Sequence, residues 1–328
     1  MNTHSKIYVA GHTGLVGSAL VRKLTHHQYN NLLLNTFEEL DLRNQKAVFD
    51  FFQQEQPEYV FLAAAKVGGI GANMEYPAAF LYDNAMITAN ILHAAHMVSV
   101  KKLLFFGSSC IYPRLCAQPI KEEYLLSGPL EPTNEPYAIA KIMGLTAVKA
   151  YRKQYGSPFI ACMPTNLYGP YDNFDLMSGH VLPALIAKFE HAQRHNKEQV
   201  LLWGSGKPLR EFLFVDDLAD AALFLMQHYD DAEHINVGTG SDISITHLAE
   251  CIKQVMQFTG TLIYDATKPD GTPRKVLSIE KLQALGWRAQ TDLIDGITKT
   301  IEWYKSNIAT HTTQLLPKAP YAQETTPS

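Results

Sequence analysis

Cysteine is scarce in this chain of 328 residues, and the patterns that would give it a structural role are missing. The four cysteines, Cys110, Cys116, Cys162 and Cys251, are irregularly spaced, so we expect no disulfide framework. Cys110 and Cys116 lack the close pairing of a zinc site, and no suitably spaced His pair follows them, so we expect no metal. The sequence indicates a reduced, cytoplasmic protein.

The chain also lacks a surplus of basic residues and any long apolar run. Its formal net charge is -4, whereas nucleic-acid binders are usually basic, so we expect no nucleic-acid partner. No run reaches the roughly 18 apolar residues that a membrane helix needs, and the N-terminus enters a strand-like run too soon for a secretory signal. A hydrophobic content of 46% with 18% charged residues is ordinary for a globular enzyme.

What the first half does contain is an alternation of two periodicities. Nearly continuous apolar runs predict strands, and amphipathic runs predict helices. The predicted strands cover 6–11, 31–35, 56–65 and 101–109, and the predicted helices cover 14–27, 86–98 and 136–156. Apolar strands alternating with helices predict an α/β fold, a Rossmann-like doubly wound parallel sheet with helices on both faces.

The pattern changes after the Pro- and Gly-punctuated stretch 163–170. We predict a dinucleotide-binding domain over 1–165 and a smaller C-terminal α/β domain over 166–305 that binds the substrate. The prediction includes the option that the chain of the second domain returns to the central sheet. Residues 306–328 are rich in Thr, Pro and Ala and show no period, so they are predicted to form a disordered tail.

A glycine turn joins the first predicted strand to the first predicted helix. Gly11, Gly14 and Gly17 let the backbone bend sharply and approach a diphosphate, which the free N–H groups of the helix N-terminus then stabilise. A purely structural turn is the alternative, but the position directly after the first strand favours cofactor binding. The residues expected to bind are Gly11, His12, Thr13, Gly14, Leu15, Val16 and Gly17.

The end of the second predicted strand is expected to lie beside the adenosine ribose. An acidic residue there favours NAD and a basic one favours NADP, but "NTFEEL" has neither signature. Asp41, followed by Leu42, is expected to contact the adenine amine. Alternatively, Asp41 caps a helix over 42–53, and the sequence leaves both interpretations open.

Tyr137 and Lys141 stand four residues apart at the start of a predicted helix, so they share one face. A nearby ammonium would lower the pKa of the phenol and let Tyr137 exchange a proton nearer neutral pH. A pair on the helix surface is the plain alternative. Ser108, at the end of the preceding strand, is a candidate to bond a substrate oxygen.

The glycine turn, the serine and the Tyr–Lys pair together resemble the extended short-chain dehydrogenase/reductase superfamily, which acts on nucleotide sugars. Sugar 4,6-dehydratases carry Thr-Asp-Glu where this chain has Ser108-Ser109-Cys110, so dehydration is not expected. The chain resembles the GDP-L-fucose synthase family of 3,5-epimerase-reductases. The shared segments run from residue 10 to residue 275 and are "AGHTGLVGSA", "AAAKVGGI", "GSSCIYP", "EPTNEPYAIAK", "MPTNLYGPYDNF", "WGSG", "REFLFVDD", "INVGTG" and "KPDGTPRK".

The resemblance implies NADPH-dependent 3,5-epimerisation and 4-reduction of GDP-4-keto-6-deoxy-D-mannose. It implies that Ser108 and Tyr137 bind the sugar carbonyl and that Lys141 also holds the nicotinamide ribose. It assigns proton transfer at C3 and C5 to Cys110 and His180, whose side chains titrate close enough to neutral pH. Without it, Cys110 would be taken as a buried packing residue.

The resemblance also implies further ligand contacts. The cofactor would meet Pro164, Asn166 and His180, and the GDP-sugar would meet Lys188, Trp203, Arg210 and Asp270. Lys188 stands where arginine is common in the family. Core packing remains an alternative for Trp203, and a turn role remains one for Asp270.

Two departures from the family bear on the cofactor. Basic residues that would hold the 2′-phosphate are absent at Thr13 and Phe37. We therefore predict NADP and leave NAD open. The alternatives for function are a C4 reductase of another GDP-4-keto sugar, such as a heptose, and a non-catalytic dinucleotide-binding relative, which the intact Tyr–Lys pair argues against. The family also implies a homodimer packed through helices 86–98 and 137–155.

Overall fold

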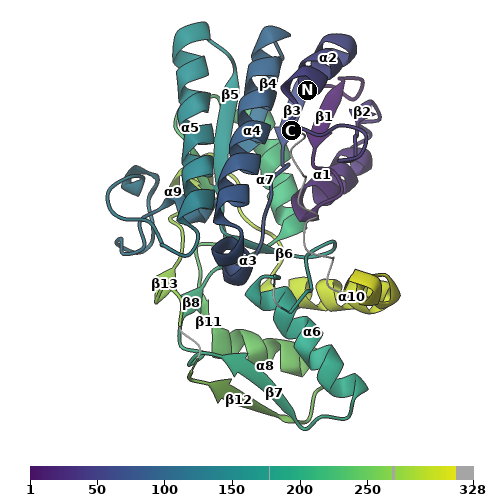
Figure 1. The fold of residues 1–328 in the computed structure, drawn as a ribbon, viewed down its shortest axis with the longest axis vertical. Helices are drawn as coiled ribbons and strands as arrows, with labels where there is room; N and C mark the ends of the chain where they lie inside the picture. Colours follow the sequence, from purple (N-terminus) through teal and green to yellow (C-terminus); the bar gives the residue numbers. More distant parts are fainter. Residues whose placement is uncertain (177, 268–269, 315–328) are drawn as a thin grey trace, which may run out of the picture.

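The computed structural model describes residues 1–176, 178–267 and 270–314, and a six-stranded parallel sheet forms its centre (Figure 1). The strand order is β10-β5-β4-β3-β1-β2, so the order reverses between β1 and β3. Ligands of such sheets bind beyond the carboxyl ends of the strands at this reversal. The strands are β1 (Ile7–Ala10), β2 (Leu32–Leu33), β3 (Tyr59–Leu62), β4 (Lys102–Phe106), β5 (Phe159–Pro164) and β10 (Ile235–Val237).

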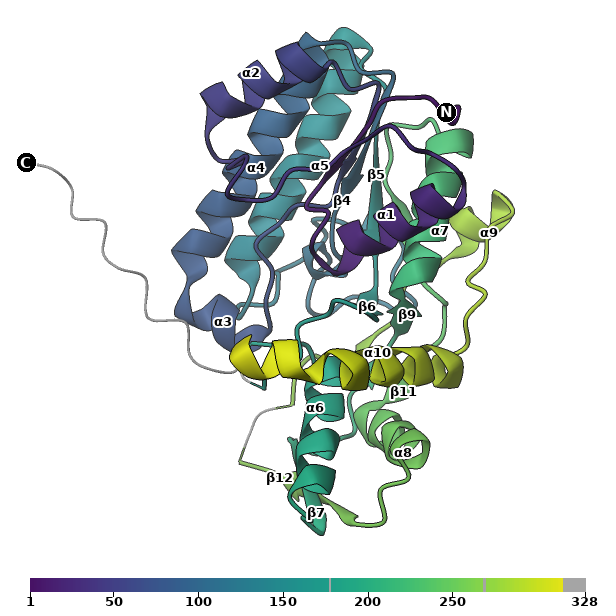
Figure 2. The same ribbon diagram turned by 90° about the vertical axis from the view of Figure 1, so that its right-hand side faces the viewer.

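Helices cover both faces of this sheet (Figure 2). One face carries α1 (Leu15–His26) and α7 (Val215–His228), and the other carries α2 (Gln45–Glu55), α4 (Pro77–Met97) and α5 (Glu135–Tyr155). Along β1, Ile7 and Val9 enter the first core while Tyr8 and Ala10 enter the second, because side chains alternate across a strand. The predicted doubly wound α/β fold is confirmed.

A smaller lobe lies below the sheet in Figure 1 and has its own core. Two helices, α6 (Val181–Arg194) and α8 (Ile245–Met256), pack with the long α10 (Leu293–Gln314), which runs across the junction in Figure 2. The short strands of this half are β6 (Asn166–Tyr168), β7 (Gln199–Trp203), β8 (Leu209–Arg210), β9 (Phe212–Phe214), β11 (Ile243–Ser244), β12 (Thr261–Asp265) and β13 (Arg274–Lys275). They form three small sheets, β7 with β12, β6 with β9, and β11-β8-β13.

The chain returns to the central sheet, as the sequence analysis allowed, because β10 pairs with β5. One strand boundary differs from expectation. The strand expected over 101–109 ends at Phe106, since residues Ser109–Ile111 form a short 3-10 turn, η1. Two further short helices are α3 (Ile70–Glu75) and α9 (Glu280–Ala284), and a second 3-10 turn, η2, covers Glu122–Tyr124.

The expected tail boundary at residue 306 is wrong. The helix α10 continues through Gln314, and its buried residues Ile297, Ile301 and Tyr304 recur at helical spacing. A helix anchored by such a face extends into the Thr- and Ala-containing segment. The rest of the expected tail, 315–328, lies outside the described residues. Over the described ranges, no helix has both the length and the apolar character that crossing a membrane requires.

Candidate active site

The glycine turn is tightly packed between β1 and α1. Gly11 has a φ of 83°, which side-chain-bearing residues rarely adopt, and a Cβ added there would lie 2.7 Å from the Ala64 Cα. A Cβ on Gly17 would lie 2.0 Å from the Gly11 carbonyl oxygen. Gly14 is the N-cap residue of α1, so the first N–H groups of that helix are directed out of the turn.

This turn suits a dinucleotide. The first N–H groups of α1 have no partner within the helix, and the helix N-terminus favours the negative charge of a diphosphate. Within the part of the chain that the structure describes, the buried Nδ1 of His12 has no hydrogen-bond partner. A bound phosphate would supply an acceptor there. Thr13 is exposed beside it, while Leu15 and Val16 are half-buried in the first turn of α1.

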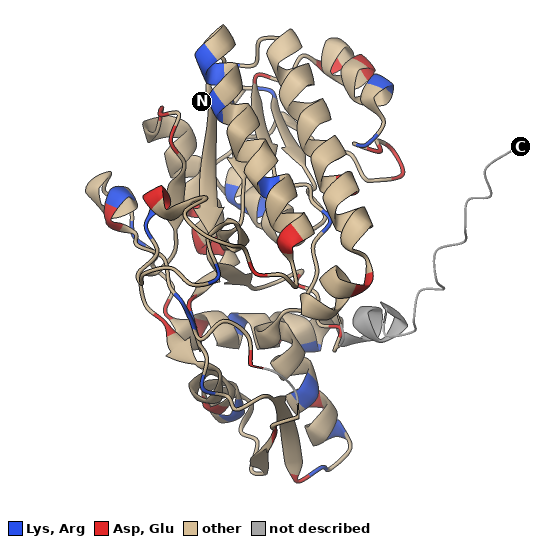
Figure 3. Ribbon diagram, turned by 60° about the vertical axis from the view of Figure 1, so that its left-hand side comes forward, with Lys and Arg blue, Asp and Glu red and all other residues tan. Residues whose placement is uncertain are grey.

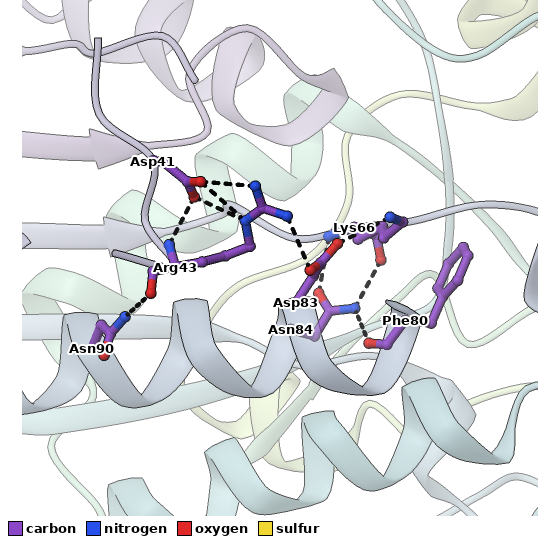
Figure 4. A network of polar contacts seen from close by, with 7 residues as sticks. All are labelled: Asp41, Arg43, Lys66, Phe80, Asp83, Asn84 and Asn90. Atoms are coloured by element: carbon purple, nitrogen blue, oxygen red, sulfur yellow. Dashed lines mark hydrogen bonds and ion pairs between the residues drawn. The ribbon is translucent and has the colours of Figure 1, made fainter. Parts of the chain in front are cut away.

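The predicted adenosine end of the site contains a network of ion pairs, drawn in Figure 4. The Arg43 guanidinium donates to Asp41 at 2.8 Å and to Asp83 at 3.2 Å, and the Lys66 ammonium donates to Asp83 at 2.9 Å. Hydrogen bonding to Arg43 lowers the pKa of the Asp41 carboxyl. The Leu42 carbonyl accepts from the Asn90 amide at 2.9 Å, which fixes this loop against α4.

The helix-cap interpretation of Asp41 is wrong. The N-cap of α2 is Asn44, whose side chain accepts from the Ala47 N–H at 3.1 Å. Phe37 is 62% exposed, and the Arg43 guanidinium lies 5.2 Å from its ring centroid. A cation therefore lies beside Phe37, although the sequence supplies none at position 37 itself.

Burial controls the titration of the Tyr–Lys pair. Lys141 is 4% exposed, its Nζ donates to the Phe106 carbonyl at 2.8 Å, and it lies 5.8 Å from the Tyr137 ring centroid. Desolvation lowers the pKa of Lys141 to about 8. Desolvation also raises the pKa of Tyr137. A hydrogen bond with Ser108 lowers that pKa but is the smallest of the contributions. The expected lowering of the phenol pKa is therefore wrong for this structure, because desolvation of the buried phenol dominates and Cys110 adds to the rise.

Cys110 lies in a polar setting directly after β4. The Asn134 amide donates to its sulfur at 3.2 Å, and the Lys275 ammonium lies 3.8 Å from the same atom. The Cys110 backbone N–H donates to the Ser108 Oγ at 3.3 Å, so the Ser108 side chain caps the η1 turn that carries Cys110. The thiol is half-buried, whereas Cys162 and Cys251 are buried in the cores. This setting favours the acid–base hypothesis over packing.

His180 is the N-cap residue of α6 and ends a loop that is tied down internally. The Asp175 carboxylate accepts from the Ser178 N–H at 2.7 Å, and the Ser178 carbonyl accepts from the Gly69 N–H at 2.7 Å. These bonds anchor the His180 loop to the start of α3. The His180 side chain reaches solvent, yet surrounding protein desolvates the ring and lowers its pKa.

The predicted substrate residues form a series across the smaller lobe. The Lys188 Nζ donates to the Leu201 carbonyl at 2.9 Å and lies 5.0 Å from the Trp203 ring centroid. Trp203 is 48% exposed, so the core-packing alternative for it is wrong. Burial lowers the pKa of both Lys188 and Arg210, and the Asp270 carboxylate partly opposes this for Arg210.

Asp270 links two loops of the smaller lobe. Its carboxylate accepts from the Ser205 N–H at 2.8 Å and from the Ser205 hydroxyl at 2.6 Å. Of the residues predicted to meet the cofactor, Pro164 ends β5 and Asn166 begins β6. The Asn166 amide donates to the Glu211 carbonyl at 2.7 Å, so that amide already holds the protein backbone.

The model of the NAD dependent epimerase/dehydratase family matches residues 7–238, from β1 to the end of the central sheet. The chain belongs to this family. The putative GDP-L-fucose synthase 2 of Arabidopsis thaliana is 56% identical over 304 residues, which cover 93% of each chain. The family relationship inferred from the sequence is therefore confirmed.

Two solved structures of family members share the fold. A GDP-L-fucose synthetase from Naegleria fowleri bound to NADP has a TM-score of 0.88 at 34% identity, covering 94% of this chain and 95% of its own. A GDP-mannoheptose C4 reductase from Campylobacter jejuni with NADP bound has a TM-score of 0.86 at 42% identity, covering 93% and 99%. Both of these structures contain bound NADP.

Three polar residues of the site were not predicted from the sequence. Asn134 and Lys275 contact the Cys110 sulfur, and Glu211 is a fully buried carboxylate beside Arg210. Glu211 accepts from the N–H groups of Gly240 at 2.7 Å and Leu277 at 2.8 Å. Asn134 and Lys275 fall inside the segments "EPTNEPYAIAK" and "KPDGTPRK". The sequence therefore identified the motifs that contain them but not their contacts with Cys110.

Proposed function

We propose that this protein catalyses the NADPH-dependent 3,5-epimerisation and 4-reduction of GDP-4-keto-6-deoxy-D-mannose to GDP-L-fucose. The observation that carries the proposal is the polar setting of Cys110, whose sulfur meets Asn134 and Lys275 close to Ser108. A reductase alone needs a carbonyl-binding serine and a tyrosine. A thiol held by two donors beside them supplies the acid–base group that epimerisation requires.

The chemistry depends on the C4 ketone of the sugar. The ketone acidifies the hydrogens on C3 and C5, so a base removes either one as a proton while the electron pair moves onto the C4 oxygen. Cys110 and His180 remove and return these protons on opposite faces, which inverts each centre. Ser108 and Tyr137 stabilise the enolate oxygen by hydrogen bonding.

Reduction of C4 follows in the same site. NADPH, when bound, supplies the hydride. Burial keeps the Tyr137 phenol protonated, so Tyr137 gives its proton to the C4 oxygen as that oxygen becomes a hydroxyl. Lys141, held by the Phe106 carbonyl, lies beneath the tyrosine ring and binds the nicotinamide ribose.

The GDP-sugar spans the smaller lobe. Lys188 and Arg210 neutralise the diphosphate, since both are cations whose burial costs less once an anion is bound. Trp203 offers an exposed flat face, and Asp270 hydrogen-bonds the nucleotide. At the other end, residues 11–17, Asp41, Leu42, Pro164 and Asn166 hold the cofactor.

The second candidate is a C4 reductase of a GDP-heptose, favoured by the structural relative that carries that name. Incubation with GDP-4-keto-6-deoxymannose and NADPH in deuterated water separates the two functions. We expect label at C3 and C5 of the product, and product without label at both carbons would rule out the epimerase step. Cys110→Ser should abolish this exchange while NADPH binding and the fold remain. If exchange were unchanged in this variant, Cys110 would be a packing residue and not an acid–base group.

The cofactor is NADP, as in both structural relatives. The ratio of kcat/KM for NADPH and NADH tests this directly, and a clear NADH preference would overturn it. We also infer a cytoplasmic location, because all four cysteines are free.

We further infer a homodimer formed through α4 and α5. Exposed apolar side chains gather on these helices, namely Leu81, Tyr82 and Met97 on α4 and Ile139 and Tyr155 on α5. Figure 3 shows helices beside the sheet with long uncharged stretches. A second copy would bury this surface by two-fold packing. Light scattering should give a dimer for the parent chain and a monomer for Met97→Glu; a monomeric parent chain would contradict the proposal.

A further inference from the structure

Asn134 occupies a helix-capping position without serving as a cap. It is the N-cap residue of α5, three residues before Tyr137, where an asparagine side chain ordinarily accepts from an N–H of the first turn. Within the described ranges its side chain makes no such bond. The amide instead turns to Cys110 and donates to its sulfur at 3.2 Å. The helix end thus gives up a common stabilising contact for a contact with the thiol.

The carbonyl oxygen of the same amide differs from the nitrogen in its hydrogen bonding. The Asn134 Oδ1 is buried, and no hydrogen-bond partner for it exists among the residues described. A thiolate can only accept, so the NH2 group must face the sulfur and the carbonyl must face away from it. Burying an amide oxygen without a donor is unfavourable, and a bound hydroxyl group would relieve that cost.

A second donor to the thiol differs from Asn134 in charge. Lys275 approaches the sulfur at 3.8 Å, and Arg210 is close enough to interact with it electrostatically. Lysine attracts an anion over a range of directions, whereas the planar amide donates along one. Asn134 also stands on the same helix as Tyr137 and Lys141, so it fixes the thiol relative to the tyrosine.

We propose that Asn134 is a positioning residue for the Cys110 thiolate and that its carbonyl accepts from a hydroxyl of the hexose. This inference rests on the proposed epimerase function. One amide would then align the base by its nitrogen and the sugar ring by its oxygen. Because the amide contacts the sulfur directly, removing Asn134 should change how fast Cys110 is alkylated.

The first test measures Cys110 alkylation by iodoacetamide across pH, followed by peptide mass mapping to separate Cys110 from the other three cysteines. Asn134→Ala should slow alkylation at pH 7 by roughly tenfold and move the profile to higher pH. Asn134→Asp, which has nearly the same shape, should move it further because it places a carboxylate beside the sulfur. Thr133→Ala, one residue earlier, is the matched control and should leave the profile unchanged.

The second test measures binding of GDP-mannose and of GDP to the same variants by calorimetry. Asn134→Ala should weaken GDP-mannose, which carries hexose hydroxyls, and leave GDP unchanged. The positioning role would be overturned if the alkylation profiles of Asn134→Ala and Asn134→Asp both coincided with that of the parent chain. If Asn134→Ala does not fold, the profile of Asn134→Asp alone decides whether Asn134 positions the thiolate. Equal losses for GDP-mannose and GDP would overturn the hydroxyl contact. Neither test requires catalytic turnover. A failure of the proposed epimerase or reductase reaction would therefore be distinguished from a failure of the role proposed for Asn134.

Discussion

The two ends of the site differ in how the protein satisfies its polar groups. At the adenosine end, Asp41, Arg43, Asp83 and Lys66 are joined by ion pairs of 2.8 to 3.2 Å. At the catalytic end, the buried Asn134 Oδ1 has no partner within the described residues. Burial also lowers the pKa of Lys141 there, and of Lys188 and Arg210 in the smaller lobe.

The difference teaches where a ligand is needed to complete the structure. Paired carboxylates and cations are already stabilised, so the adenosine end is formed before anything binds. Unpaired polar atoms and desolvated cations are costly, and anionic or hydroxyl groups of a ligand remove that cost. Such preorganised groups are what transition-state stabilisation requires, because they need not reorganise during the reaction.

The largest expected effect is at the catalytic end. Tyr137→Phe removes the phenol that gives its proton to the C4 oxygen, so kcat for reduction should fall by roughly 10²- to 10⁴-fold. The Kd for NADPH should be unchanged, because the ring remains. Tyr151→Phe, on the same helix but bonded to His93, should keep near-normal activity. Near-normal reduction by Tyr137→Phe would remove the tyrosine from the mechanism.

The next effect concerns stability and pH. The pKa of Lys141 is lowered to about 8 in the folded chain, against about 10.4 when unfolded, so below pH 8 the fold bears the full cost of a buried ammonium. That cost is about 3 kcal/mol and disappears as pH rises from 8 to 10.4. Lys141→Met should therefore be more stable than the parent chain at pH 7, and the advantage should shrink by pH 10.

Thermal unfolding of the two proteins at pH 7 and pH 10 measures this change. Lys149→Met is the control, because Lys149 is on the same helix and its ion pair with Glu233 is exposed. Its stability relative to the parent chain should stay nearly constant across that range. A Lys141→Met advantage that stays constant would show that Lys141 is not desolvated as described.

Short-range motifs explain what the sequence could predict. The glycine turn, the pair Tyr137–Lys141 and the strand before Ser108 are each set within a few residues, and all were placed correctly in the fold. Asn134 and Lys275 were missed as partners of Cys110 because they lie 24 and 165 residues from it. The fold alone brings such residues together.

The alternatives that the structure excludes, and the missed direction of the Tyr137 shift, have equally local causes. Asp41 and Asn44 are both good helix caps, and the sequence could not tell which one α2 uses. The spacing of Tyr137 and Lys141 indicates a shared face but not its burial, so the sign of the phenol shift was missed. Trp203 looks like a core residue by type, and only the fold shows that it is half exposed.

The smallest expected effect tests whether the adenosine end is truly complete without ligand. Arg43→Gln leaves Asp83 paired with Lys66 but removes the ion pair of Asp41. The free energy of unfolding should therefore fall by about 1 kcal/mol. This value is modest because the side chain of Arg43 is 34% exposed and its charge is screened by solvent. Lys46→Gln, which breaks an exposed pair with Asp50, should change it by less than about 0.5 kcal/mol. Cys110 alkylation should not respond to either change. Urea unfolding measures the first quantity, and an Arg43→Gln variant that altered thiol reactivity would show that the two ends are coupled rather than independent.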